Sequence, residues 1–311
     1  MRTFEEVINK VQSYPVKTLA VVEAADETVL SAVKKAYETK LAKAVLFGRR
    51  SEIEKTADKC GLSLKDILIE EAPDDISSAK KAALYVREGK ADILMKGYIH
   101  TDDLLRAVLD RETGLRSGSF MSHVFILQAE DKFILISDGS MNIAPSLEDK
   151  SKIILNALYL AEILQIENPR VAVMAAVELV NPLMHATLDA AALGQMNNRG
   201  QFSPKCFIDG PFALDNAVNE RAAKHKNIRG EVAGKADILI VPNIETGNML
   251  AKSFVYFAKG KIAGVLVNAS APVVLTSRAD SEEVKYNSIA IAVLMSNAVR
   301  HLKLKIGAVN Y

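Results

Sequence analysis

Tryptophan is absent from this chain, and only two cysteines occur, Cys60 and Cys206, far apart and in no CxxC arrangement. That scarcity gives no sign of a disulfide framework or a thiolate metal site. The sequence also lacks a run of 18 uninterrupted apolar residues, and its first residues, MRTFEEVINKVQ, carry acids where a signal peptide needs an apolar stretch. We therefore expect a cytoplasmic protein with no membrane partner.

The chain has no excess of either charge, because 39 Lys and Arg residues nearly balance 38 Asp and Glu residues. No long run of basic residues forms a track for a phosphate backbone, so nucleic acid is not an expected partner. Hydrophobic residues make up 49% of the chain, which is enough for a real core. The length of 311 residues exceeds one average domain, and we expect two domains.

Several motifs of nucleotide-binding and hydrolase sites are missing, namely GxGxxG after the first strand, GxxxxGK[ST] and GxSxG. The five histidines are never spaced as HExxH or HxH, which argues against a metal site. His100 differs from the other histidines, because it lies beside Thr101 in a loop after a predicted strand. Ligand binding is one interpretation of His100, and a surface or supporting role is the other.

Short runs rich in Val, Ile and Leu alternate with longer segments of helical period. The first pairs are Leu19 to Glu23 with Glu27 to Lys40, and Ala44 to Phe47 with Ser51 to Cys60. Later strands are expected at Val171 to Ala175, Cys206 to Ile208, Ile238 to Val241, Gly264 to Val267 and Val273 to Leu275. The runs are continuously apolar, which is typical of strands buried on both faces. The sequence therefore predicts an α/β fold with mostly parallel sheets covered by helices.

The hexapeptide GKADIL occurs twice, at Gly89 to Leu94 and at Gly234 to Leu239. Convergence on a helix stop, an Asp and an apolar strand is one explanation. The other is a duplicated strand, loop and helix, with one copy per domain. Each copy leads into a polar loop at the carboxyl end of a strand, where open α/β sheets bind ligands. The candidate substrate-binding residues in these loops are His100, Thr101, Thr246, Gly247 and Asn248.

The first domain boundary is expected at the turn-rich loop GSMNIAPS, which follows a predicted strand at Phe133 to Asp138. The last helix, about Glu283 to Leu302, has a mostly apolar side and should dock back onto the first domain. Residues 1–140 with 287–311 are then the first α/β domain, and residues 141–286 form a second, inserted one.

One stretch, VVLTSRADS from Val273 to Ser281, gathers hydroxyls and a guanidinium at the end of a predicted strand. Arg278 offers the two-pronged donor geometry that matches a phosphate, and Ser277 stands beside it. The acids Asp280 and Glu283 lie close to a helix start, where carboxylates also serve as caps. The motif alone leaves catalysis and capping open.

Four stretches together resemble the phosphate acetyltransferases and, more closely, the phosphate butyryltransferases: KGYIHTDDLLRAVL, DGPFALDNA, VAGKADILIVPNIETGNMLAKSFVYFA and VVLTSRADS. The resemblance runs along nearly the whole chain. It implies two α/β/α domains like those of isocitrate dehydrogenases, an active site in the cleft between them, and a homodimer or larger assembly. It also implies butanoyl-CoA and phosphate as substrates, coenzyme A as substrate or product without any cofactor, and functional coupling to a butyrate kinase.

The same resemblance implies roles for individual residues. Ser277 falls near the sulfur of coenzyme A, Arg278 falls on phosphate, and Arg106 looks like a second phosphate-binding arginine. The acetyl enzymes carry an aspartate seven positions after that serine, thought to act as general base, and this position is Val284 here. Asp280 is then the nearest candidate for the base and Glu283 the next, with capping as the alternative for both.

The expected reaction is reversible and direct transfer of a butanoyl group in a ternary complex, with one carboxylate handling the proton. Cys60 and Cys206 are interpreted as buried, inert thiols. Acetyl-CoA is the alternative substrate, since one methylene is worth only about 1 to 3 kcal/mol in a pocket. Two rivals of other classes are a two-domain ligand-binding protein without catalysis and a metal-dependent decarboxylating dehydrogenase. The first lacks its usual export signal, and the second lacks its set of aspartates.

Overall fold

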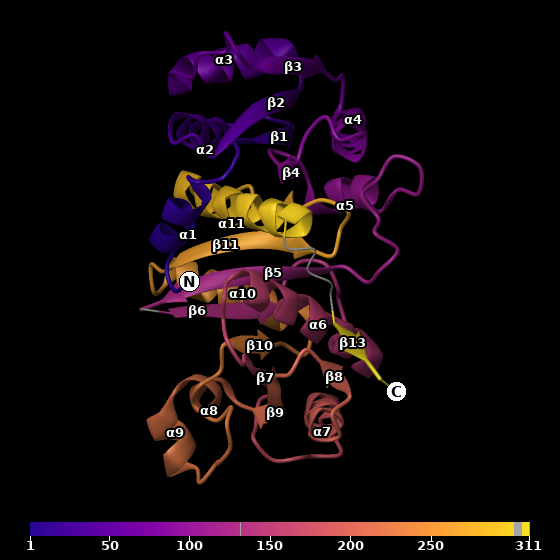
Figure 1. Cartoon of the computed structure of the whole chain (residues 1–311), viewed down its shortest axis with the longest axis vertical. Helices are drawn as coiled ribbons and strands as arrows, with labels where there is room; N and C mark the ends of the chain where they lie inside the picture. The colour runs from indigo at the N-terminus through magenta and orange to yellow at the C-terminus, as the bar shows by residue number, and fades with distance from the viewer. Residues whose placement is uncertain (131, 302–306, 311) are drawn as a thin grey trace. The chain divides into compact units, whose positions relative to one another are not determined.

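The computed structural model describes residues 1–130, 132–301 and 307–310 of the chain. These residues form two compact units, and most of their elements are labelled in Figure 1. The amino-terminal unit contains Thr3–Ser119 and the described residues from Ile262 to the end of the last helix. The central unit contains Met1–Arg2, Phe120–Lys261 and residues 307–310.

The sheet of the amino-terminal unit has the strand order β3-β2-β1-β4-β12-β11. Every neighbouring pair is parallel except β11 and β12, which are antiparallel. The strands are β1 (Lys17–Val22), β2 (Ala42–Gly48), β3 (Leu68–Glu71), β4 (Ile93–Lys96), β11 (Lys261–Val267) and β12 (Val273–Val274). The central strands are buried on both faces, as their continuous apolar runs predict.

Helices cover both faces of this sheet, with α2 and α4 on opposite sides of β1 and β2 in Figure 1. The helices are α1 (Phe4–Val11), α2 (Glu27–Glu38), α3 (Arg50–Cys60), α4 (Asp75–Arg87), α5 (Thr101–Leu109) and α11 (Glu282–His301). Helices α2 and α4 begin where sequence chemistry favours it, because the side chains of Asp26 and Asp74 accept hydrogen bonds from their first turns. The last helix begins one residue before its expected start, and Leu302, its expected end, lies outside the described residues.

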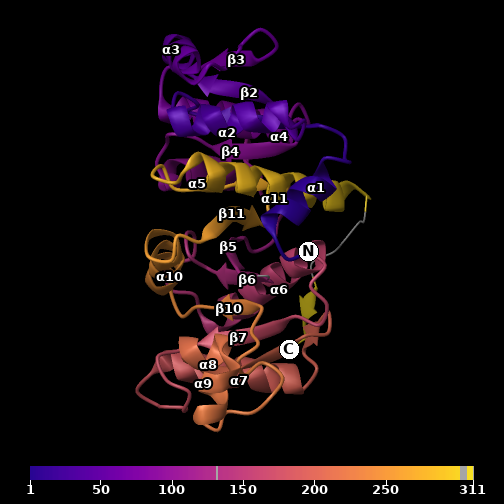
Figure 2. The ribbon, with the colours of Figure 1, turned by 90° about the vertical axis from the view of Figure 1, so that its left-hand side faces the viewer.

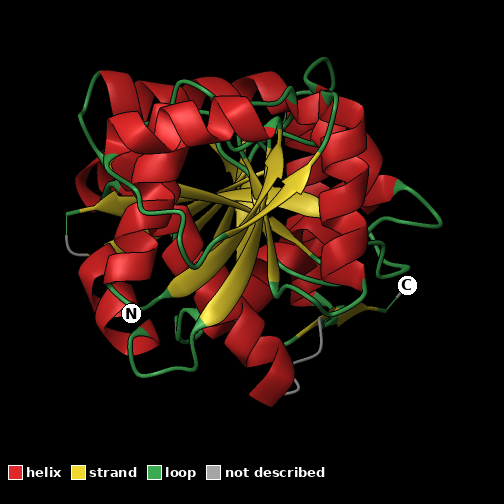
Figure 3. Cartoon of the chain, turned by 90° about the horizontal axis from the view of Figure 1, so that it is seen from above, coloured by secondary structure: helices red, strands yellow, loops and turns green. Residues whose placement is uncertain are grey.

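The sheet of the central unit has the strand order β5-β6-β10-β7-β9, parallel except for β5 with β6. Its strands are β5 (Ser122–Ala129), β6 (Lys132–Ser137), β7 (Arg170–Met174), β9 (Phe207–Phe212) and β10 (Ile238–Ile240). Its helices are α6 (Leu147–Ile163), α7 (His185–Asn198), α8 (Leu214–Val218), α9 (Glu220–His225) and α10 (Ile244–Tyr256), and α6 and α10 flank β5 and β6 in Figure 2. A separate ribbon pairs β8 (Phe202–Ser203) with β13 (Ala308–Val309). The mostly parallel α/β architecture is confirmed, with strands enclosed by helices in Figure 3.

The compact units divide after Ser119 and Lys261, whereas the expected domain boundaries followed residues 140 and 286. Strand pairing accounts for the first difference, because β5 and β6 form a hairpin and β6 continues the sheet through β10. It also accounts for the second, because β12 pairs with β4 and so carries VVLTSRADS into the amino-terminal unit. That motif therefore belongs to the same unit as KGYIHTDDLL.

The two GKADIL segments have the same local structure, one in each unit. Both glycines adopt a left-handed conformation, with φ of 74° at Gly89 and 75° at Gly234. The aspartate that follows each glycine accepts a hydrogen bond from the backbone at the start of a neighbouring strand. Asp92 accepts from the Thr18 N–H at 2.9 Å, and Asp237 accepts from the Arg170 N–H at 3.0 Å. Each segment continues as strand, loop and helix, as the sequence predicts.

Candidate active site

Sheet register brings two of the polar loops of the amino-terminal unit together. Lys96, the last residue of β4, pairs with Val22 at the end of β1, and Met95 pairs with Val274 at the end of β12. The three strands are parallel, so the segments that follow them leave from one edge of the sheet. The loop before α5 and the loop after β12 are therefore neighbours. We call the second one, residues 276–280, the TSRAD loop.

Arg278 is held at this edge by two side chains from the loop before α5. Its two terminal nitrogens each lie 3.4 Å from a ring nitrogen of His100, which sets the guanidinium alongside the imidazole. Its Cζ also lies 5.5 Å from the ring centroid of Tyr98, within the range of a cation–π contact. These contacts orient an exposed cation whose donors remain available to an anion.

The TSRAD loop is closed by Asp280, whose Oδ2 accepts a hydrogen bond of 2.7 Å from the Ser277 N–H. The buried Lys285 of α11 donates to the backbone carbonyls of both residues and so fixes the loop to this helix. The first turn of α11 is instead capped by Ser281, whose Oγ accepts from the Val284 N–H at 3.4 Å. The interpretation of Asp280 as the cap of α11 is therefore wrong, because the Asp280 carboxylate accepts its hydrogen bond from Ser277 and not from the helix.

Glu283 and Val284 lie in the first turn of α11 with different surroundings. Glu283 is exposed, while Val284 is buried. Val284, the position at which the resemblance implies an aspartate in the acetyl enzymes, is thus part of the apolar core in this chain.

Helix α5 begins without a side-chain cap, since His100 at its N-cap makes no capping hydrogen bond. Thr101 is its first residue and is half-buried. An uncapped helix start presents backbone N–H donors and the positive end of the helix dipole, both of which favour an anion. Arg106, about one and a half turns further along, has a side chain that is 78% exposed and pairs with Asp103 at 3.4 Å. In the described part of the chain, no hydrogen bond or ion pair joins Arg106 to Ser277 or Arg278.

The corresponding helix of the central unit, α10, is capped. The side chain of Asn243 accepts from the Thr246 N–H at 3.0 Å and from its hydroxyl at 2.7 Å. Gly247 lies so close to the backbone at Asp138 that a Cβ there would be 2.7 Å from its carbonyl oxygen, and Asn248 donates to the Gly139 carbonyl at 3.2 Å. These contacts give Thr246, Gly247 and Asn248 structural roles in seating α10, while their ligand-binding role stays a prediction.

Lys96 was given no role by the sequence reasoning, although it begins the KGYIHT motif. It is only 2% exposed, and burial, followed by the nearby charges of Arg278 and Lys285, lowers its pKa to about 8. The carboxylates of Asp280 and Asp26 act in the opposite direction. The available signal was a lysine at the end of a buried apolar strand, where burial of a charged side chain needs an explanation.

The two cysteines differ from each other. Cys206 is buried, and burial raises the pKa of its thiol to about 11, which disfavours the reactive thiolate. Cys60 ends α3 and is only half-buried, with its Sγ 3.5 Å from the Glu27 carbonyl oxygen. The expectation of two buried thiols is therefore right for Cys206 and wrong for Cys60, because the last turn of α3 lies near the surface.

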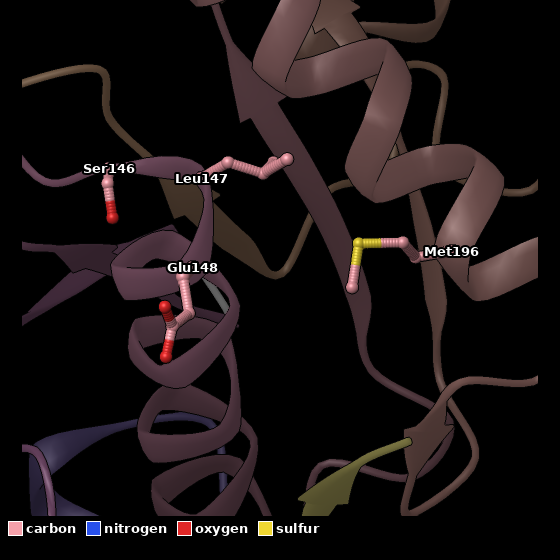
Figure 4. A pocket seen from close by; sticks show the side chains of 4 residues that line it. All are labelled: Ser146, Leu147, Glu148 and Met196. Carbon is pink, nitrogen blue, oxygen red and sulfur yellow. The ribbon is translucent and has the colours of Figure 1, made fainter. Parts of the chain in front are cut away.

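A pocket of about 560 Å³ in the central unit is lined by residues outside every predicted site, namely Ser146, Leu147, Glu148 and Met196. Figure 4 shows the apolar side chains of Leu147 and Met196 facing one another from α6 and α7. Its lining includes a carboxylate and no cation, which does not suit a phosphate. Within residues 1–130, 132–301 and 307–310, no group of three or more His, Cys, Asp or Glu side chains is placed to hold a metal ion. The helices in the same ranges include none long and apolar enough to cross a membrane.

Known proteins are similar to this chain in sequence and in fold. Residues 67–293 match the family described as phosphate acetyl/butaryl transferase. The phosphate butyryltransferase of Clostridium acetobutylicum is 47% identical over 95% of this chain and 99% of its own length. The phosphate acetyltransferase of Thermotoga maritima is 44% identical over 90% of this chain and 95% of its own length.

Among solved structures, a branched-chain phosphotransacylase from Enterococcus faecalis is 31% identical to this chain, with a TM-score of 0.79. The match covers 90% of this chain and 99% of that one. The TSRAD loop, Arg278 with its His100 and Tyr98 contacts, and the uncapped start of α5 lie within the matched region of the family, at one edge of one sheet. The chain belongs to the phosphate acetyl/butaryl transferase family, and it is an acyltransferase.

Proposed function

We propose that this protein reversibly transfers a butanoyl group between coenzyme A and inorganic phosphate. The observation that carries the proposal is the placement of Arg278 beside His100 at the uncapped start of α5, with Ser277 next to Arg278 in the chain. A cation, a hydroxyl and free backbone donors form the surroundings that a phosphate needs. The choice of a four-carbon acyl group follows the 47% identity to a phosphate butyryltransferase, and acetyl-CoA is the alternative substrate.

In the proposed reaction, an oxygen of hydrogen phosphate attacks the thioester carbonyl carbon and the carbon–sulfur bond breaks. The phosphate becomes butanoyl phosphate, and its proton passes to the departing thiolate of coenzyme A. Arg278 neutralises phosphate charge, and the Ser277 hydroxyl donates to the sulfur as negative charge develops there. Asp280 accepts and returns the proton, with Glu283 as the alternative base.

Coenzyme A is substrate and product, and no cofactor is needed. Arg106 and Thr101 help to bind phosphate, while Thr246, Gly247 and Asn248 help to bind the acyl-CoA. We further propose a cytoplasmic homodimer or larger homo-oligomer, whose butanoyl phosphate is consumed by a butyrate kinase.

A thiol-release assay tests this function. Purified protein is mixed with phosphate and acyl-CoA of two to six carbons, without added metal or nucleotide, and free thiol is followed over time. Butanoyl-CoA should react fastest and acetyl-CoA more slowly, with no release when phosphate is omitted. Absence of release with every acyl-CoA would contradict the function, whereas faster acetyl transfer would contradict only the choice of substrate.

A further inference from the structure

The Lys96 side chain is buried, and its ammonium has no ion-pair partner among the described residues. Its side chain is only 2% exposed, at the carboxyl end of β4. Among the residues that the structure describes, none forms a hydrogen bond or ion pair with this ammonium. Burial of an unpaired ammonium is unfavourable by several kcal/mol, so a protein retains one where something else supplies the missing charge.

The groups around Lys96 increase this deficit of negative charge. Two cations, Arg278 and Lys285, act on Lys96 more strongly than the two carboxylates, Asp280 and Asp26. The Asp280 carboxylate also accepts a hydrogen bond from the Ser277 N–H, and the Lys285 ammonium donates to two backbone carbonyls. The cluster therefore retains net positive charge, of which Lys96 and Arg278 are the unneutralised members.

A second buried group at the same edge of the sheet has no partner. Thr276 is 4% exposed, and its hydroxyl oxygen has no hydrogen-bond partner within the described ranges. It stands two residues beyond Val274, which pairs with Met95, so it lies at the same end of the sheet as Lys96. A hydroxyl and an ammonium both donate hydrogen bonds, and a shared oxyanion would satisfy both.

We propose that the Lys96 ammonium binds the oxygens of the inorganic phosphate substrate next to Arg278, and that Lys96 is a catalytic residue of this enzyme. The inference rests on the proposed function and deepens it. A phosphate dianion supplies the charge that the cluster lacks. Its binding restores a favourable environment for the protonated amine, so the lysine is charged in the complex.

Binding measurements on Lys96→Met test the inference without turnover. Methionine has a similar length and tolerates burial, which keeps the core filled. The control is Lys43→Met, because Lys43 also lies in a strand of this unit but is exposed. Calorimetric titration at pH 7 with inorganic phosphate alone should show a Kd raised roughly 10- to 100-fold in Lys96→Met and unchanged in Lys43→Met.

Coenzyme A, titrated in the same way, distinguishes the two possible sources of a phosphate oxygen. Its Kd should stay within about twofold of wild type in Lys96→Met. An equal loss for coenzyme A and inorganic phosphate, or a larger loss for coenzyme A, would place Lys96 on the phosphates of the coenzyme and overturn the assignment. Wild-type phosphate affinity in Lys96→Met would also overturn it.

A pH series on the wild-type protein keeps the inference testable if Lys96→Met does not fold. The phosphate Kd should rise as the pH passes about 8, where the free ammonium loses its proton. Arg278 stays charged throughout this range. Repeating the series on Lys285→Met separates the titration of Lys96 from that of Lys285. A phosphate Kd that stays constant from pH 7 to 9.5 in the wild type would contradict the inference.

Failure of the inference and failure of the proposed function have different signatures. If wild type releases thiol and Lys96→Met binds phosphate normally, the function stands and the role of Lys96 is rejected. If wild type releases no thiol but loses phosphate binding through Lys96→Met, the anion site stands and the reaction is rejected.

Discussion

The Asp280 carboxylate and the Ser277 backbone N–H are joined by a hydrogen bond of 2.7 Å. This contact shapes the loop that presents Ser277 and Arg278, so Asp280 has a structural role in addition to any proton that it accepts. The two roles separate in variants, because an asparagine oxygen can accept the same hydrogen bond without being basic.

Asp280→Asn should lower kcat by roughly 10² to 10⁴ while leaving the melting temperature unchanged. The loop keeps its closing hydrogen bond, but the base is lost, so the acidic limb of the pH–rate profile should also disappear. Asp280→Ala removes both roles and should in addition destabilise the loop. Steady-state thiol release across pH and thermal unfolding of both variants measure the difference.

Glu283→Gln is the control for the base, since Glu283 is exposed in the next helix. A large loss of kcat in Glu283→Gln, with Asp280→Asn active, would transfer the role to Glu283. Full activity in both variants would mean that neither carboxylate handles the proton, and His100 would be tested next.

Arg278→Ala should chiefly raise the phosphate KM, with little change in the KM for butanoyl-CoA. A hydrogen bond to a charged group is worth about 1.5 to 3 kcal/mol, or roughly 10- to 150-fold. Initial rates over a grid of both substrate concentrations provide the two constants. An equal rise for butanoyl-CoA would show that Arg278 is not specific for phosphate.

Arg106→Ala should raise the phosphate KM less than Arg278→Ala does. The Arg106 guanidinium is 78% exposed and shares its charge with Asp103, so solvent screening weakens its contact with an anion. The same kinetic grid compares the two arginines. A larger effect from Arg106 would show that its side chain turns toward the phosphate during the reaction.

Lys96→Met should be more stable than wild type at pH 7. The Lys96 pKa is about 8 in the folded protein and 10.5 for the free side chain, so folding disfavours its proton. This cost is fully present below pH 8 and disappears as the pH rises to 10.5, which makes stability rise over that window. The difference between these two pKa values limits the gain in the free energy of unfolding to roughly 3 kcal/mol.

Urea unfolding of wild type and Lys96→Met at pH 7 and pH 10.5 measures this gain. We expect the stability difference between the two proteins to be about 1 to 3 kcal/mol at pH 7 and to shrink at pH 10.5. Lys43→Met again serves as the control, because its side chain is exposed. A variant less stable than wild type at pH 7 would show that Lys96 has stabilising contacts in the free protein.

The double variant Cys60→Ala/Cys206→Ala should retain most activity, because direct transfer needs no covalent carrier. Burial raises the pKa of Cys206 to about 11, and Cys60 lies at the end of α3, away from the TSRAD loop in sequence and in the sheet order. Thiol release and circular dichroism of the variant check activity and folding together. An acyl-cysteine trapped on the wild type by mass spectrometry would contradict direct transfer.

Local sequence was a good guide to individual elements of the fold. The run expected as a strand at Val273 to Leu275 is β12 at Val273–Val274, and the helix expected at Glu27 to Lys40 is α2 at Glu27–Glu38. Apolar runs and helix caps act over a few residues, so they can be read along the chain. The grouping of Ser277 and Arg278 directly after a strand could be read from the sequence for the same reason.

Contacts between distant segments were harder to predict. His100 and Arg278 are 178 residues apart, and they meet because β4 and β12 are adjacent in the sheet. The family resemblance places Arg106 on phosphate, and this role stays a prediction, because the structure shows only the ion pair of Arg106 with Asp103. Strand order depends on the packing of the whole sheet, which no single segment encodes.

The sequence by itself determined that this chain is a mostly parallel α/β protein and that its polar motifs follow buried strands, because apolar periodicity and turn residues are local properties. Tertiary structure alone decided that Asp280 turns back to Ser277 instead of capping α11. It also decided that Lys96 is buried among cations, because β1 and β12 flank β4 and exclude water from the end of that strand. The pKa of a side chain depends on the burial and charges that long-range pairing brings to it.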